Sequence, residues 1–191
     1  QINAEVELID GEVISYQESG NAFTDVHRLM GTTDGHMDNV HNLRAQYQAD
    51  VCALIVNSLD DNGRVPNNSI PATYHNAFFV VRANVAVGNY SFTHELGHLL
   101  GGRHETSKNT GIGNPNLAAP DNDSTFLNGN WRTFCHGLAG DNWIVGTHSG
   151  KLKTIMGVYI NKENDPYRRI PFFSNPQISA GNNQVIGHWD Y

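Results

Sequence analysis

The sequence is poor in positive charge and in long apolar runs, and each shortage disfavours a class of partner. Its 191 residues include 12 Lys and Arg against 19 Asp and Glu, a formal net charge of −7. This balance disfavours nucleic acid and anionic membrane surfaces, because both attract cationic proteins. No apolar run approaches the ~18 residues that a membrane-spanning helix needs. We therefore expect no nucleic-acid partner and no membrane partner.

The start of the sequence also lacks a signal-peptide pattern, and cysteine is scarce. Residues 1–5 have neither the basic nor the apolar region of a signal peptide, so we expect a processed chain or one given without its leader. The only cysteines, Cys52 and Cys135, leave two alternatives open. They form one disulfide, or Cys52 is a free buried thiol. The apolar strand pattern around Cys52 favours the free thiol.

The rest of the composition is ordinary for a globular protein. With 39% hydrophobic residues, a chain of this length can form one domain with a substantial core, and we expect a single domain over residues 1–191. Hydrophobic periodicity, proline positions and turn residues then predict the early elements. These are a strand over 4–16, a polar loop over 20–35, a helix over 36–48, a strand buried on both faces over 50–56, an edge strand at 64–65 and a strand over 77–87.

The strongest pattern in the chain is the run His94-Glu95-Leu96-Gly97-His98-Leu99-Leu100-Gly101-Gly102-Arg103-His104. On a helix, the four-residue spacing of His94 and His98 puts both imidazoles on one face, where they can bind one ion. Gly101 can adopt positive φ, so the helix can stop there and His104 can return as a third ligand. Three nitrogen ligands leave a fourth zinc position open for water, as in catalytic sites. Glu95 can reach that water as a base.

The same helix is expected to have an apolar side. At ~100° per residue, four apolar residues lie roughly opposite the two histidines: Phe92, Leu96, Leu99 and Leu100. This side can pack on a sheet while the histidines face a cleft.

The pattern His-Glu-x-x-His-x-x-Gly-x-x-His resembles that of the metzincin zinc endopeptidases, which also have a downstream methionine turn. Thr154-Ile155-Met156-Gly157 is similar to that turn. Residues 88–92 and 170–176 are similar to bacterial reprolysin-like metzincins, a group close to the peptidyl-Asp metalloendopeptidases. The resemblance implies an α+β metzincin-type zincin fold, with a twisted mixed sheet and an active-site helix over an irregular C-terminal subdomain. The subdomains would cover about 1–101 and about 102–191.

The resemblance also implies a function. It predicts a secreted zinc metalloendopeptidase with one catalytic Zn²⁺ on His94, His98 and His104, and with Glu95 as the catalytic base. The substrate would be a peptide or protein, held as an extended strand against a sheet edge. Met156 is expected to pack beneath the zinc without binding it. No pattern in the sequence indicates an oligomeric state.

The sequence departs from the family patterns in three places. Glu105 follows the third histidine as in astacins, where reprolysins have Asp, and Tyr159 lies one residue beyond the position of the astacin zinc-binding tyrosine. The strand and long helix that such families have ahead of residues 4–16 are not visible.

A calcium site at Asp121 and Asp123 is the weaker alternative to a solvated loop. The competing functions are an inactive metal-binding interaction module, which retention of Glu95 disfavours, and a zinc hydrolase of non-peptide substrates.

The resemblance finally bears on specificity. In metzincins the chain after the methionine turn forms the wall of the pocket for the residue after the scissile bond. Here that chain offers apolar side chains at Tyr159, Ile170, Phe172 and Phe173, and cations at Lys162, Arg168 and Arg169. We expect an apolar-preferring pocket, since the arginines follow an Asp-Pro turn signal. A preference for acidic residues is the alternative.

Overall fold

The structure, a computed structural model, describes residues 5–66, 77–100, 102, 104, 137, 139–157, 166–173, 175–181 and 184–186. The chain divides into two compact units, Gln1–Leu99 and Leu100–Tyr191. Helices and small mixed sheets together make the described chain α+β, the class that the sequence predicts. No described helix combines the length and the apolar character needed to cross a membrane.

The first unit is built on a three-stranded sheet with the order β1-β3-β2. Strand β1 (Cys52–Val56) runs parallel to β3 (Phe78–Arg82), with Cys52 opposite Phe78. Strand β2 (Gly63–Arg64) pairs antiparallel with the other side of β3, with Gly63 opposite Val81. The edge strand that the sequence predicts at 64–65 is therefore present, beginning one residue earlier.

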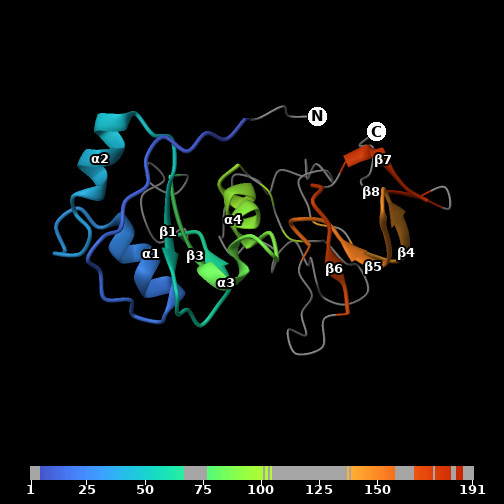
Figure 1. Ribbon diagram of the computed structural model, residues 1–191, viewed down its shortest axis with the longest axis horizontal. Helices are drawn as coiled ribbons and strands as arrows, with labels where there is room; N and C mark the ends of the chain where they lie inside the picture. The colour runs from blue at the N-terminus through green and yellow to red at the C-terminus, as the bar shows by residue number, and fades with distance from the viewer. Residues whose placement is uncertain are drawn as a thin grey trace, which may run out of the picture. The chain divides into compact units, whose positions relative to one another are not determined.

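Helices cover both faces of the central strand β3. Helix α1 (Ala22–Met30) lies on one side of the sheet and α4 (Ser91–Leu99) on the other, as Figure 1 shows. Because successive strand residues point to opposite faces, Phe78 and Val80 pack into the core with α1, while Phe79 and Val81 pack into the core with α4. Strand β3 is thus the hydrophobic centre of the unit.

Two strand predictions need correction. Strand β1 is buried on one face only: Leu54 and Val56 are buried against α1, whereas Ile55 on the other face is 56% exposed. Strand β1 lies at the edge of the sheet. The strand predicted over 77–87 ends at Arg82, and the short helix α3 (Ala83–Ala86) follows it directly.

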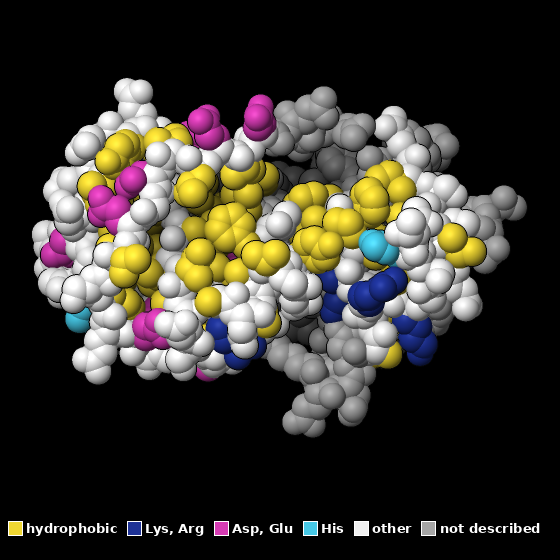
Figure 2. Space-filling model, in the orientation of Figure 1, with side chains coloured by type: hydrophobic (Ala, Val, Ile, Leu, Met, Phe, Trp, Pro, Cys, Tyr) yellow, Lys and Arg dark blue, Asp and Glu magenta, His cyan; other side chains and the backbone are white. Residues whose placement is uncertain are grey.

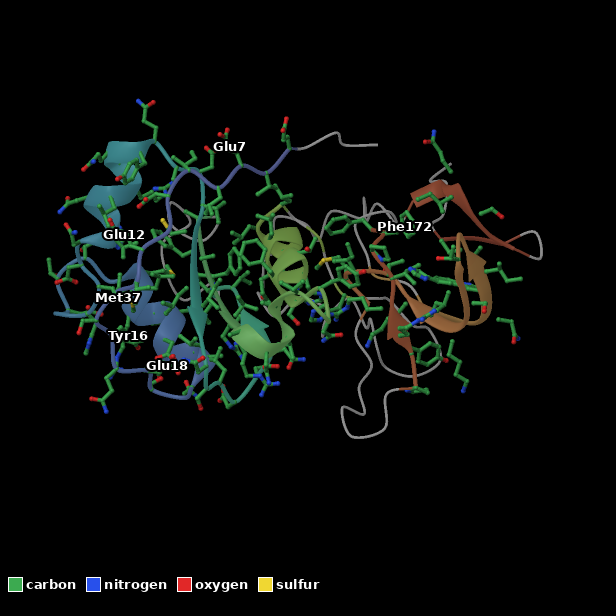
Figure 3. All side chains as sticks on the ribbon, in the orientation of Figure 1. Glu7, Glu12, Tyr16, Glu18, Met37 and Phe172 are labelled. Carbon is green, nitrogen blue, oxygen red and sulfur yellow. The ribbon has the colours of Figure 1, made fainter. Side chains whose placement is uncertain are left out.

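The strand predicted over 4–16 is wrong for its described residues. Residues 5–19 form no strand, and apolar side chains there, such as Leu8 at 83%, are largely exposed. Figure 2 shows apolar side chains at the surface of the first unit. Alternation favours a strand only when a neighbouring strand completes the hydrogen bonds, and no described strand pairs with this segment. Instead Tyr16, labelled in Figure 3, ties the segment to α1 by donating its hydroxyl hydrogen to Asp25.

The polar loop predicted over 20–35 is also wrong, because α1 occupies its middle. The side chain of Asn21 caps the helix by accepting from the backbone N–H of Thr24 at 2.9 Å. Asp60 accepts from the N–H of Ala22 at 2.8 Å, so the helix start is also fixed by a distant loop. The predicted helix over 36–48 is present as α2 (Val40–Tyr47), which begins later than expected.

Cys52 is a free thiol at the start of β1, in agreement with the alternative that the sequence favours. The side chain is half-buried, whereas the sequence predicts a buried thiol. Its partial burial raises the pKa of the thiol. Cys135 lies outside the described residues.

The second unit contains more regular structure than the irregular subdomain that the resemblance implies. Its first sheet has the order β4-β5-β6, with β4 (Ala139–Val145) antiparallel to β5 (His148–Lys153) and β6 (Arg168–Arg169) parallel to β5. Strands β7 (Asn175–Gly181) and β8 (Gln184–Ile186) form an antiparallel pair. The core of this unit comprises Trp143, Val145, Leu152, Ile170 and Ala180.

Candidate metal centre

Helix α4 carries the first part of the histidine pattern and is fixed to the sheet by its apolar side. Phe92 and Leu96 are partly buried against the core of Phe79, Val81 and Leu99. The rings of Phe79 and Phe92 lie edge to face, with centroids 5.0 Å apart. Leu100, which the sequence places on this side, is exposed because the helix ends at Leu99.

The two helical histidines lie close together on α4. Their Nε2 atoms are 3.1 Å apart, and their ring planes are nearly perpendicular at 86°. His94 is 6% exposed, and His98 is half-buried. The four-residue spacing therefore brings two imidazole nitrogens to one point, as the helix geometry requires.

His104 completes a group of three. One ring nitrogen from each of His94, His98 and His104 lies within 4.8 Å of the others. Among the residues that the structure describes, this is the one group of three or more metal-ligating side chains gathered closely enough to hold an ion. The third imidazole, from His104 beyond the end of α4, thus lies close to those of His94 and His98.

The donor set fits a metal ion. Tetrahedral ligation with Zn–N distances of about 2.0–2.1 Å separates two nitrogens by about 3.3 Å, close to the 3.1 Å between the Nε2 atoms of His94 and His98. Imidazole nitrogens suit zinc and several other transition metals. The three histidines can therefore hold one such ion, and they supply three of the four ligands of a tetrahedral zinc site.

Glu95 lies between the two helical histidines in sequence and is 5% exposed. Its side chain reaches β2, where a Cβ atom built on Gly63 would lie 2.8 Å from its Oε1 atom. Sequence reasoning missed this contact. The run Asp60-Asp61-Asn62-Gly63 indicates a turn, and no local signal connects Gly63 with a helix much later in the chain.

The segment Thr154–Gly157 follows β5 as a buried turn, in which the N–H of Gly157 donates to the carbonyl of Thr154 at 3.0 Å. Met156 within it is 1% exposed. Gly137 lies directly against this turn, because a Cβ atom on Gly137 would lie only 2.4 Å from backbone atoms of Met156 and Gly157. Sequence reasoning missed Gly137 as well.

The two arginines of β6 differ in their surroundings. Arg169 is half-buried, and its Nη2 donates to the carbonyl of Gly157 at 3.0 Å, whereas Arg168 is exposed. The expected exposure therefore holds for Arg168 only, and the expected turn is wrong for both residues, because they form strand β6. Ile170 and Phe172 belong to the core of the second unit or pack against it.

Other residues singled out in the sequence lie outside the described residues. They are Gly101, Glu105, Asp121, Asp123, Tyr159 and Lys162.

Comparison with known proteins gives one consistent result. No family model matches the chain, and no solved structure matches it significantly. The chain is 32% identical over 174 residues to a peptidyl-Asp metalloendopeptidase of Stenotrophomonas maltophilia strain K279a, an alignment that covers 91% of this chain and 36% of the relative. It is 34% identical over 175 residues to a peptidyl-Asp metalloendopeptidase of Xanthomonas campestris pv. campestris, covering 91% and 34%. The chain thus spans about a third of the length of these curated relatives.

Proposed function

We propose that this chain, which is similar to bacterial proteins named peptidyl-Asp metalloendopeptidase, is a zinc-dependent endopeptidase of the metzincin type. The observation that carries the proposal is the convergence of His94, His98 and His104, with Glu95 on the same helix. Secretion stays a prediction from the resemblance.

In this proposal, His94, His98 and His104 hold one zinc ion. The bound ion would lower the pKa of water toward neutrality and polarise the scissile carbonyl. Glu95 takes a proton from the attacking water and returns it to the leaving amine, which is the work of a general base and then a general acid. Burial of Glu95 among packed groups holds its carboxylate in one place, which favours this role.

Strand β2 is the proposed docking edge for substrate. It is an edge strand of the first sheet, and it lies beside the helix that carries Glu95. An extended peptide can add to such an edge through backbone hydrogen bonds. This mode of binding does not require a chain terminus, and it favours cleavage within a chain over removal of terminal residues.

Two competing functions make different predictions. An inactive metal-binding module has no use for a buried carboxylate between two ligands, so Glu95 favours the enzyme. A hydrolase of non-peptide substrates would not cut peptides at all. Cleavage of peptides that depends on both metal and Glu95 therefore separates the three functions.

The test is product analysis by mass spectrometry after incubation with a library of unmodified peptides. We expect internal cleavage by the parent protein, loss of cleavage with chelator and recovery on adding zinc. Glu95→Gln is the matched control, because it keeps the size of the side chain and removes the base. Unchanged cleavage in chelator, or in Glu95→Gln, would contradict the proposal.

Specificity forms the second part of the proposal. The relatives are named for cleavage at aspartate, and the half-buried Arg169 beside Gly157 is the better placed of the two β6 arginines to pair with a carboxylate. We therefore propose an acidic preference after the cut, in place of the apolar preference expected from the sequence. In cleavage profiles, Arg169→Ala should lose a preference that Arg168→Ala, its exposed neighbour, retains. If the parent prefers apolar residues after the scissile bond, the proposed acidic preference is wrong and the expectation from the sequence holds.

A further inference from the structure

A glycine on the edge strand lies against the carboxylate-bearing side chain of α4. A Cβ atom built on Gly63 would lie 2.7 Å from Cγ, 2.8 Å from Oε1 and 3.0 Å from Cδ of Glu95. These separations are shorter than atoms in ordinary packing adopt. The side chain of Glu95 thus occupies the space that any other residue at position 63 would need.

The backbone around Gly63 is held in place. Gly63 is paired with Val81 on β3, and the N–H of Arg82 donates to the carbonyl of Asn62 at 2.9 Å. The guanidinium of Arg82 donates to the side chain of Asn62, also at 2.9 Å. These contacts prevent β2 from retreating from α4.

The helix side of the contact is fixed as well. Phe92 packs edge to face on Phe79 of the sheet, and Leu99 is buried in the same core. Since both backbones are held, an added methyl group must displace the end of the Glu95 side chain. The requirement is for space and not for an unusual backbone conformation, because Gly63 does not have positive φ.

We propose that Gly63 is a positioning residue for Glu95. Its missing side chain leaves the space in which the Glu95 carboxylate is held, so that strand β2 sets where the base lies. This inference rests on the proposed function, in which Glu95 is the catalytic base. A shift of the carboxylate by about 1 Å is enough to reduce catalysis strongly.

The kinetic test compares Gly63→Ala with Gly88→Ala. Gly88 is a matched control in the same unit, because a Cβ atom there meets nothing within 4 Å. With zinc content measured for each variant, we expect Gly63→Ala to keep its metal, to lose at least tenfold in kcat and to change KM by less than threefold. Gly88→Ala should behave as the parent. Parent-like kcat in Gly63→Ala, or an equal loss in Gly88→Ala, would overturn the proposal.

A thermal unfolding cycle tests the contact without measuring turnover. Gly63→Ala is introduced into the parent, into Glu95→Gln and into Glu95→Ala, and each protein is measured in chelator. The glutamine keeps the shape of the glutamate, so Gly63→Ala should lower Tm in the parent and in Glu95→Gln. The alanine removes the crowding atoms, so the decrease should disappear in Glu95→Ala. An equal decrease in all three backgrounds would overturn the proposal.

The two measurements also separate this inference from the proposed function. If the parent cuts no peptide, the proposed function fails, while the unfolding cycle still decides whether Gly63 makes room for Glu95. If Gly63→Ala does not fold, recovery of folding in Gly63→Ala/Glu95→Ala supports the contact. If Glu95→Ala folds but the double variant does not, the result counts against the proposed contact.

Discussion

Two buried segments of this protein lie against a glycine, and the groups that crowd the two glycines differ. On α4, the end of the Glu95 side chain fills the space beside Gly63. In the turn Thr154–Gly157, backbone atoms of Met156 and Gly157 fill the space beside Gly137. The first contact can give way when a side chain moves, and the second only when the chain itself moves.

Because of this difference, we expect one contact to affect turnover and the other to affect stability. A change at the α4 contact should move one reactive group with a smaller loss of stability, so its largest effect should appear in turnover. A change at the Thr154–Gly157 turn should strain the backbone, so its effect should appear in stability. The following variants test whether the two segments can be separated in this way.

The largest effect is expected from the metal ligands. His104→Ala should lose both zinc and activity, because a site with three protein ligands depends on each of them. His148→Ala, a half-buried histidine of β5 outside the group, is the matched control. Zinc content by elemental analysis and peptide cleavage should be measured together. Stoichiometric zinc with full activity in His104→Ala would show that another group is the third ligand.

Glu95→Gln should come next, with zinc retained and turnover reduced by a factor of about 10²–10⁴, the usual contribution of a general base. Tm should stay close to that of the parent, because the amide keeps the size of the carboxylate. Peptide cleavage, zinc content and thermal unfolding together check this prediction. Turnover within a few-fold of the parent would remove Glu95 from its role.

Gly137→Ala should affect stability more than turnover. The added methyl group meets backbone atoms at 2.4 Å, and overpacking of this kind typically costs about 1–3 kcal/mol. Denaturant unfolding of Gly137→Ala and of Gly88→Ala, where the methyl group is unopposed, measures the cost. Equal stability of the two variants would mean that the turn adjusts freely.

Met156→Leu should have the smallest effect. Met156 is fully buried, and an apolar replacement of similar volume usually costs less than about 1.5 kcal/mol. The variant should keep its zinc and its activity. Met30→Leu, a buried methionine in the core around α1, provides a matched comparison. Loss of zinc from Met156→Leu alone would show that the thioether does more than pack.

The sequence predicted best the features that depend on neighbours in the chain. The spacing of His94 and His98 places both rings on one helix face, and the apolar run of β3 forms its buried strand. Helix α1 was missed although the sequence holds two signals for it. Asn21 is a standard helix cap. The buried apolar residues of the helix have helical spacing, and Asp25 is the one polar residue among them: Ala22, Val26, Leu29 and Met30.

Features that depend on distant partners could not be predicted. The alternation over residues 4–16 predicts a strand, but no described strand pairs with it. The contacts of Gly63 with Glu95 and of Gly137 with Met156 join segments far apart in the chain, and a glycine alone does not indicate what fills the space beside it.

The most direct test of the central claim is a zinc titration of the metal-free protein. Chelator-treated protein receives known amounts of zinc, and cleavage of one library peptide is followed by mass spectrometry. We predict no cleavage without zinc, then a linear increase that stops at one zinc per chain. Cleavage by the stripped protein, or full zinc binding without cleavage, would contradict the account.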